Sequence, residues 1–212
     1  MPLQEAYDRL FAAYGPQSWW PAETRFEVMV GAVLVQNTAW GNVERAVANL
    51  KAAGLLSPQP LYDAPLEELE QHIRPSGVYR VKARRLRELV ALVVERYGGS
   101  LDAMFQSPSE ELRNELLALN GIGPETADCI LLYAAGRPAF VIDAYTRRVL
   151  ERHGWAEAGI SYDELKSLFE SHLPRDAQLF NEYHALLVEV GKRHCRKVAV
   201  CERCPLEEML PK

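Results

Sequence analysis

Residues 116–148 read LLALNGIGPETADCILLYAAGRPAFVIDAYTRR and carry the strongest structural signal in the chain. An apolar helix end runs into a Gly-x-Gly turn, and Pro124 follows where a second helix begins. Proline suits that position because it is pre-set for the first helical turn and has no N–H to lose there. The glycines allow positive φ and close backbone approach. The stretch therefore predicts a helical hairpin whose second helix points unpaired N–H groups outward, which is an anion site.

Asp143 stands alone after the apolar residues Val141 and Ile142 and before a new helix. Aspartate is favoured at a helix N-cap, and on position alone a cap is the simpler interpretation. The hairpin also has an ordinary alternative, a plain connection between two antiparallel helices. A cap and a catalytic role for Asp143 are compatible, so the local sequence leaves both open.

The hairpin LNGIGPETA, followed at this spacing by VIDAYTRR, resembles the helix-hairpin-helix and catalytic aspartate of the endonuclease III-like (HhH-GPD) superfamily of DNA glycosylases. The resemblance covers about residues 5–205 and is closest to the bacterial branch that excises 3-methyladenine. It implies that Asp143 is catalytic. It also implies that the hairpin binds DNA through Asn120, Gly121, Ile122, Gly123 and Thr126.

Glu125 departs from the bifunctional members of that superfamily. Those members carry a lysine here, which attacks C1′ of the sugar and forms a Schiff base. A carboxylate cannot form an imine. Because Glu125 occupies the catalytic lysine's position in the family, we count it with Asp143 as the expected catalytic residues. Because it is not an amine, we expect a monofunctional glycosylase with weak or absent AP lyase activity.

The end of the apolar helix at residues 24–35 is a second expected DNA contact. The resemblance implies that Gln36 fills the gap left by a rotated nucleotide and that Asn37 lies at the DNA surface. Asn37 and Thr38 could instead cap the next helix, expected over residues 40–53.

A basic stretch is the third expected contact. Six cations and no acid lie between Arg74 and Arg87. Such a run is usually a solvated face, but its density and its likeness to the family's GxYxxKAxxL segment favour phosphate contact, with Tyr79 and Lys82 at the DNA.

Three tryptophans are candidate walls of a base pocket, because bases stack on aromatic rings. Trp19 and Trp20 are adjacent and precede a proline, and the same WWP occurs in the 3-methyladenine branch. One of the pair could instead be core and the other surface packing. Trp40 is either a core residue of its helix or a second wall of the pocket.

The chain has 212 residues, 48% hydrophobic and 25% charged, with a net charge of −5, as in ordinary globular proteins. We expect one or two domains, no membrane span and, without a leader, a cytoplasmic, nucleoid-associated protein. No segment alternates like a strand, so we predict an all-α fold with two helical lobes. One lobe spans 24–137 with the hairpin at 116–135. The other combines 1–23 and 138–212, and the active site lies in the cleft between them.

The C-terminal tail carries Cys195, Cys201 and Cys204. The family often holds a [4Fe–4S] cluster with Cys-x6-Cys-x2-Cys-x5-Cys, and four cysteines are the usual ligands. Here the first gap is x5 and the fourth position is Leu210. A cluster would need an open iron or a non-cysteine donor, such as His194 or Glu207. A zinc site of three cysteines and a histidine and an empty loop are the alternatives.

We therefore expect a monomeric base excision repair enzyme that flips a damaged base from double-stranded DNA and hydrolyses its N-glycosidic bond. An alkylated purine such as 3-methyladenine is favoured, because a cationic base suits aromatic walls. One alternative is an endonuclease III-type glycosylase for oxidised pyrimidines. Another is a lesion- or structure-binding DNA module without chemistry.

Overall fold

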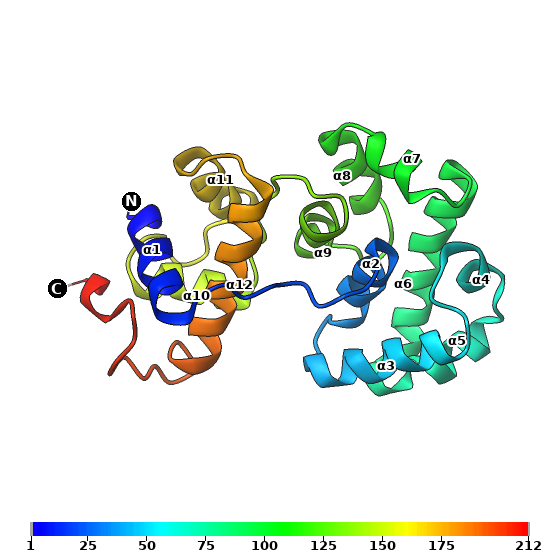
Figure 1. Cartoon of the computed structure of the whole chain (residues 1–212), viewed down its shortest axis with the longest axis horizontal. Helices are drawn as coiled ribbons and strands as arrows, with labels where there is room; N and C mark the ends of the chain where they lie inside the picture. The colour runs from blue at the N-terminus through cyan, green and yellow to red at the C-terminus, as the bar shows by residue number, and fades with distance from the viewer. Residues whose placement is uncertain (1, 212) are drawn as a thin grey trace. The chain divides into compact units, whose positions relative to one another are not determined.

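The computed structural model describes residues 2–211, and within them all regular structure is helical (Figure 1). The prediction of an all-α fold is confirmed. The chain divides into two compact units, one of Ala22–Ala135 and one that combines the described residues up to Pro21 with those from Gly136 onward. In the described part of the chain, no helix is both long and apolar enough to cross a membrane.

The unit Ala22–Ala135 is built around α2 (Arg25–Leu34), of which eight residues are buried. Thr24 caps this helix, since its side chain accepts a hydrogen bond from the backbone N–H of Glu27. The other helices of the unit are α3 (Trp40–Ala52), α4 (Pro58–Asp63), α5 (Leu66–His72), the short η1 (Arg74–Ser76), α6 (Tyr79–Ala91), α7 (Leu101–Gln106), α8 (Ser109–Leu117) and α9 (Pro124–Cys129). α6 and α9 continue as π-helical segments, η2 (Leu92–Arg96) and η3 (Ile130–Ala134). α2 packs against α3, α6, α9 and η3, so the central buried helix expected at 24–35 is confirmed.

The second unit contains α1 (Leu3–Tyr14), α10 (Ala144–Arg152), α11 (Tyr162–His172), α12 (Ala177–Arg193) and the short η4 (Glu207–Met209). Its core is aromatic: Phe140 stacks on Phe169 with ring centroids 3.7 Å apart, and Tyr183 packs edge-on against both. The buried Tyr183 hydroxyl donates a hydrogen bond to the Leu3 carbonyl at 2.8 Å, which ties α12 to α1.

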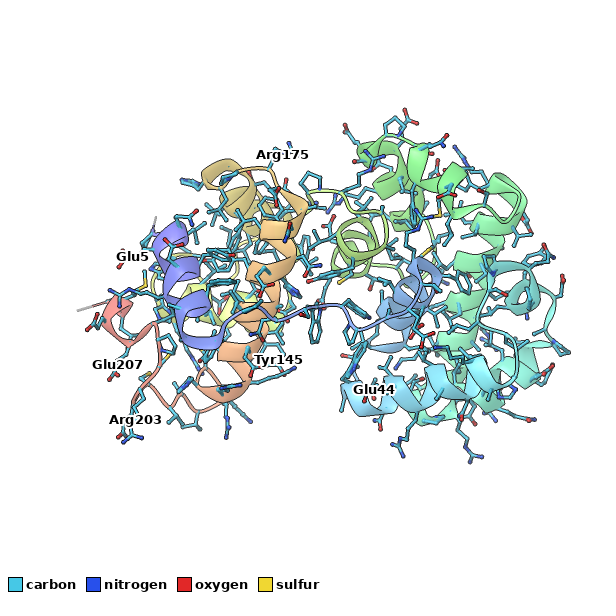
Figure 2. The ribbon with its side chains drawn as sticks, viewed as in Figure 1. Glu5, Glu44, Tyr145, Arg175, Arg203 and Glu207 are labelled. Carbon is cyan, nitrogen blue, oxygen red and sulfur yellow. The ribbon has the colours of Figure 1, made fainter. Side chains whose placement is uncertain are left out.

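α10 and α12 pack closely where Tyr145 meets Gly191. A Cβ atom at Gly191 would lie 2.5 Å from the Tyr145 ring, so no larger residue fits without a shift. Tyr145 is labelled in Figure 2. The absence of a side chain at Gly191 therefore allows a close approach of the two helices that carry the acidic site described below.

Two helices were not predicted from the sequence: α4, and α7 in residues 101–119, where a loop and the first hairpin helix were expected. Ser107 and Pro108 break that stretch, since proline cannot continue the preceding helix. α12 runs to Arg193, three residues beyond the helix 177–190 that its apolar pattern predicts.

Candidate DNA-binding surface and acidic site

The hairpin turn depends on one of its two glycines. Gly121 has φ of 81°, and a Cβ there would lie 2.1 Å from the Nε atom of Arg85. Gly123 is extended, with φ of −90°, and has no atom within 4 Å of an added Cβ. It is the N-cap of α9, and Pro124 follows as the first helical residue, as predicted. Position 121 therefore requires glycine for two reasons, the left-handed backbone conformation and the close approach of Arg85.

Gln36 connects the end of α2 to this hairpin. Its side-chain Nε2 donates to the Gly121 carbonyl at 3.1 Å and to Thr126 Oγ1 at 3.0 Å. Its Oε1 accepts from Arg85 at 2.5 Å. The expected insertion of Gln36 into DNA stays a prediction, and it would require these three hydrogen bonds to break.

Asn37 and Thr38 do not cap α3. The N-cap is Ala39, which makes no side-chain capping bond, and Thr38 Oγ1 instead accepts from Asn42 Nδ2 at 2.9 Å. Asn37 is exposed and left-handed, with φ of 53°. The capping alternative is therefore wrong, and Asn37 remains available as a surface contact.

The basic stretch at 74–87 does not form one surface. Lys82 is 2% exposed, and its Nζ donates to the carbonyls of Leu34 at 2.9 Å and Ser76 at 2.6 Å. Burial, together with the charge of Arg85, lowers the pKa of Lys82. Because the ammonium is enclosed and bonded to backbone, this structure contradicts the expected DNA contact at Lys82. Arg87 is also used internally, donating to backbone carbonyls at the end of α4.

The exposed cations of this stretch are Arg74, Arg80 and Arg84. The guanidinium carbons of Arg74 and Arg80 lie 5.9 and 5.8 Å from the centroid of the Tyr79 ring. Val78, beside Tyr79, was not predicted as a surface feature. It is 67% exposed and left-handed with φ of 45°, an unusual conformation for a β-branched residue.

The remaining hairpin residues are divided between surface and interior. Glu125 and Asn120 are exposed, and the Asn120 backbone N–H donates to Glu88 at 2.9 Å. Ile122 and Thr126 are buried and support the turn from within. Ile122 therefore cannot present its side chain to DNA, although its backbone belongs to the turn.

Asp143 is the N-cap of α10, as its sequence position indicated. Its Oδ1 accepts from the Thr146 backbone N–H at 2.7 Å. Its Oδ2 lies 3.8 Å from Nε2 of His184 on α12, and the Asp143 side chain is 14% exposed. Burial lowers the pKa of His184, and the Asp143 charge opposes that shift. His184 was not predicted from the sequence, because no local pattern marks it.

Trp19 and Trp20 lie edge to face, with centroids 5.9 Å apart, and both are half-buried. The Lys192 ammonium lies 5.4 Å from the Trp19 ring centroid. Trp40 is half-buried at the first position of α3, in the other unit. The base-pocket role of the three stays a prediction.

The three tail cysteines line one cavity, together with His194, Glu207 and Leu210. Burial raises the pKa of the Cys204 thiol, and charge on Cys201 and Cys195 acts in the same direction. Within residues 2–211, no group of three or more His, Cys, Asp or Glu residues is arranged to hold a metal ion. Cys195, Cys201 and Cys204 thus line one cavity without being grouped as a metal site in this structure, and the fourth family position, Leu210, is apolar.

Two arginines of α10 donate hydrogen bonds to Cys195, which lines this cavity. Arg152 donates to Cys195 Sγ at 3.3 Å, and Arg148 donates to the Cys195 carbonyl at 2.5 Å. His194 Nδ1 lies 3.1 Å from the Val200 carbonyl. The Glu207 carboxylate accepts from the Arg203 backbone N–H at 3.2 Å; both residues are labelled in Figure 2.

Comparison with known proteins places this geometry in a family. Residues 30–175 match the profile of HhH-GPD superfamily base excision DNA repair proteins. A Methanocaldococcus jannaschii protein, whose name gives DNA repair glycosylase as an unproven activity, is 48% identical over 97% of this chain and 94% of its own.

Two solved structures are similar in fold and length. The Helicobacter pylori 3-methyladenine DNA glycosylase, bound to 1,N6-ethenoadenine, has a TM-score of 0.78 and 29% identity, over 91% of this chain and 98% of that one. A non-covalent endonuclease III–DNA complex has a TM-score of 0.83 and 27% identity, over 98% and 93%.

Proposed function

Because the chain belongs to the HhH-GPD superfamily of base excision DNA repair proteins, we propose that it is a monofunctional DNA N-glycosylase for alkylated purines such as 3-methyladenine. DNA repair glycosylase activity follows from the family. The finer proposal rests chiefly on Glu125, an exposed carboxylate in the first turn of α9 at the place where bifunctional relatives carry their lysine. Without an amine there, no Schiff base forms.

The reaction begins with extrusion of the damaged nucleotide, which costs a few kcal/mol. Backbone N–H groups of the hairpin and the exposed arginines 74, 80 and 84 are suited to phosphate, and such contacts position a duplex without reading its sequence. Breaking the N-glycosidic bond then places positive charge on the sugar. A preorganised Asp143 carboxylate stabilises that charge and can orient the attacking water, and the Thr146 N–H anchors one oxygen of this carboxylate.

The preference for an alkylated purine has two supports. The similar 3-methyladenine glycosylase was solved with an alkylated adenine analogue, and this chain carries the adjacent half-buried pair Trp19 and Trp20. A cationic base is attracted to aromatic faces, and it departs without strong activation. A second candidate, removal of oxidised pyrimidines, is favoured by the equally extensive likeness to endonuclease III.

The proposed cofactor is a [4Fe–4S] cluster on the thiolates of Cys195, Cys201 and Cys204, which line one cavity. When bound, such a cluster would join the end of α12 to the tail, so that its binding free energy contributes to folding. Leu210 cannot serve as a fourth ligand. Iron and sulfide analysis of protein purified without air tests this, and Cys201→Ser and Cys204→Ser should lose the brown colour together. A colourless protein with about one zinc, or none, contradicts it.

The activity test uses duplexes that carry 3-methyladenine or thymine glycol, with release of the free base and strand cleavage measured separately. We expect release of 3-methyladenine, no cleavage, and no adduct after borohydride treatment. Glu125→Lys should give some trapped adduct, weakly, because the surrounding residues are not arranged for a lysine. Efficient trapping of the wild type contradicts monofunctional action. Binding without release of any base favours the DNA-binding module.

A further inference from the structure

Asp143 and His184 form a polar pair inside the unit that contains α10 and α12. One carboxylate oxygen is already bonded to the α10 backbone at 2.7 Å. The other faces the His184 ring at 3.8 Å, and both side chains are largely buried, at 14% and 6% exposed. α10 and α12 approach each other closely where Tyr145 meets Gly191. The carboxylate therefore has one oxygen fixed by its own helix and one facing the neighbouring helix.

Burying a histidine at a helix–helix contact costs free energy through desolvation of its ring nitrogens, unless polar partners compensate for the lost water. The α12 residues that follow His184, namely Ala185, Leu186 and Leu187, are apolar and buried, so this histidine is an ionisable residue in a largely apolar stretch of the helix. Burial also lowers the pKa of His184. An uncharged ring can donate an N–H to the carboxylate without cancelling the negative charge that a cationic sugar requires.

We propose that His184 is a positioning residue for Asp143: its Nε2–H donates to Oδ2 in the DNA complex and fixes the orientation of the carboxylate toward the sugar. The separation of 3.8 Å exceeds a hydrogen bond, and catalytic hydrogen bonds often tighten only when substrate is bound. This inference rests on the proposed glycosylase function. It concerns a residue that acts through Asp143 and does not itself touch the reacting atoms.

Two substitutions separate positioning from packing. Gln keeps an N–H donor near the place of Nε2, and Leu has a comparable volume without a donor. We expect His184→Leu to lower the single-turnover rate of base release by about 10²-fold at unchanged DNA affinity, as for a misoriented catalytic group. We expect His184→Gln to recover most of that rate. A wild-type rate in His184→Leu, or an equal loss in both variants, overturns the proposal.

A second measurement does not depend on activity. ¹⁵N NMR of the histidine ring in the complex with lesion DNA reports which nitrogen carries hydrogen, with His184→Gln identifying the signal. We expect a protonated Nε2 in the wild type and a shifted signal in Asp143→Asn. An unprotonated Nε2, or a signal that ignores Asp143→Asn, overturns the proposal even if His184→Leu fails to fold. If the wild type releases no base from any lesion, the proposed function fails instead, and the NMR result still decides whether His184 holds Asp143.

Discussion

Replacing Lys82 with methionine tests whether this cation supports the fold or contacts DNA. Its Nζ donates to the last carbonyl of α2, at Leu34, and to Ser76 at the end of η1, at 2.9 and 2.6 Å. Both acceptors lie at helix C-termini, where a cation is favourable. Methionine fills similar space but leaves two buried carbonyls without their donor. Each loss costs about 1–3 kcal/mol, and removing the buried charge returns part of that cost.

We therefore expect Lys82→Met to lose about 2 kcal/mol of unfolding free energy, or about 4–8 °C in melting temperature. The lowered pKa also determines in which direction the unfolding free energy changes with pH. Because the folded pKa of Lys82 is below the ordinary lysine value of 10.5, the unfolded chain binds more protons in the interval between the two values. Wild-type stability should gain a contribution as pH rises through that interval, and the variant should lack it.

The salt dependence of DNA affinity distinguishes the buried Lys82 from the exposed Arg84. The dependence of affinity on salt should keep its slope in Lys82→Met, because no phosphate contact is removed. Arg84→Met, an exposed change on the same helix, should reduce the slope by about 0.9 and leave stability within about 0.5 kcal/mol. If Lys82→Met lowers the slope like Arg84→Met while stability is unchanged, the enclosed position of Lys82 is the wrong explanation.

Three further changes test the site. Asp143→Asn keeps a capping oxygen, so single-turnover base release should fall by orders of magnitude while DNA binding persists; unchanged turnover removes Asp143 from catalysis. Gly121→Ala should cost more than about 1 kcal/mol and weaken DNA binding, because alanine is strained at φ of 81° and its Cβ would displace the Arg85 side chain. Gly123→Ala is the matched control and should be nearly neutral in urea unfolding. His184 has a lowered folded pKa, so wild-type stability should decline as pH falls below about 6.5, and His184→Gln should show a smaller decline.

The helices were largely predictable because their signals are local. Pro124 at the start of α9 and Asp143 at the start of α10 act through their own backbone, so neighbouring sequence suffices to recognise them. α4, with sequence PQPLYD, was missed because two prolines in six residues read as a loop. Its buried contact is Leu61, which depends on packing that no local pattern records.

The site was only partly predictable because its side chains meet across long stretches of chain. Lysine is almost never fully buried without partners, and the partners of Lys82 are backbone carbonyls on other helices. His184 likewise acquires significance only from Asp143. Gln36 was recognised by resemblance, but its bonds to the hairpin required the folded backbone. Residue type and spacing identified candidates, and tertiary contacts determined which of them face solvent.

The pairing of α1 with α12 has a consequence for how the protein is made. Synthesis proceeds from the N-terminus, so Ala22–Ala135 is available to fold before the ribosome has produced α12. Until then the buried face of α1 lacks the α12 residues that cover it, among them Tyr183. This face consists of Leu3, Ala6 and Leu10. α1 thus emerges well before the helix that covers it, and until translation reaches α12 its apolar face is available to chaperones and to aggregation.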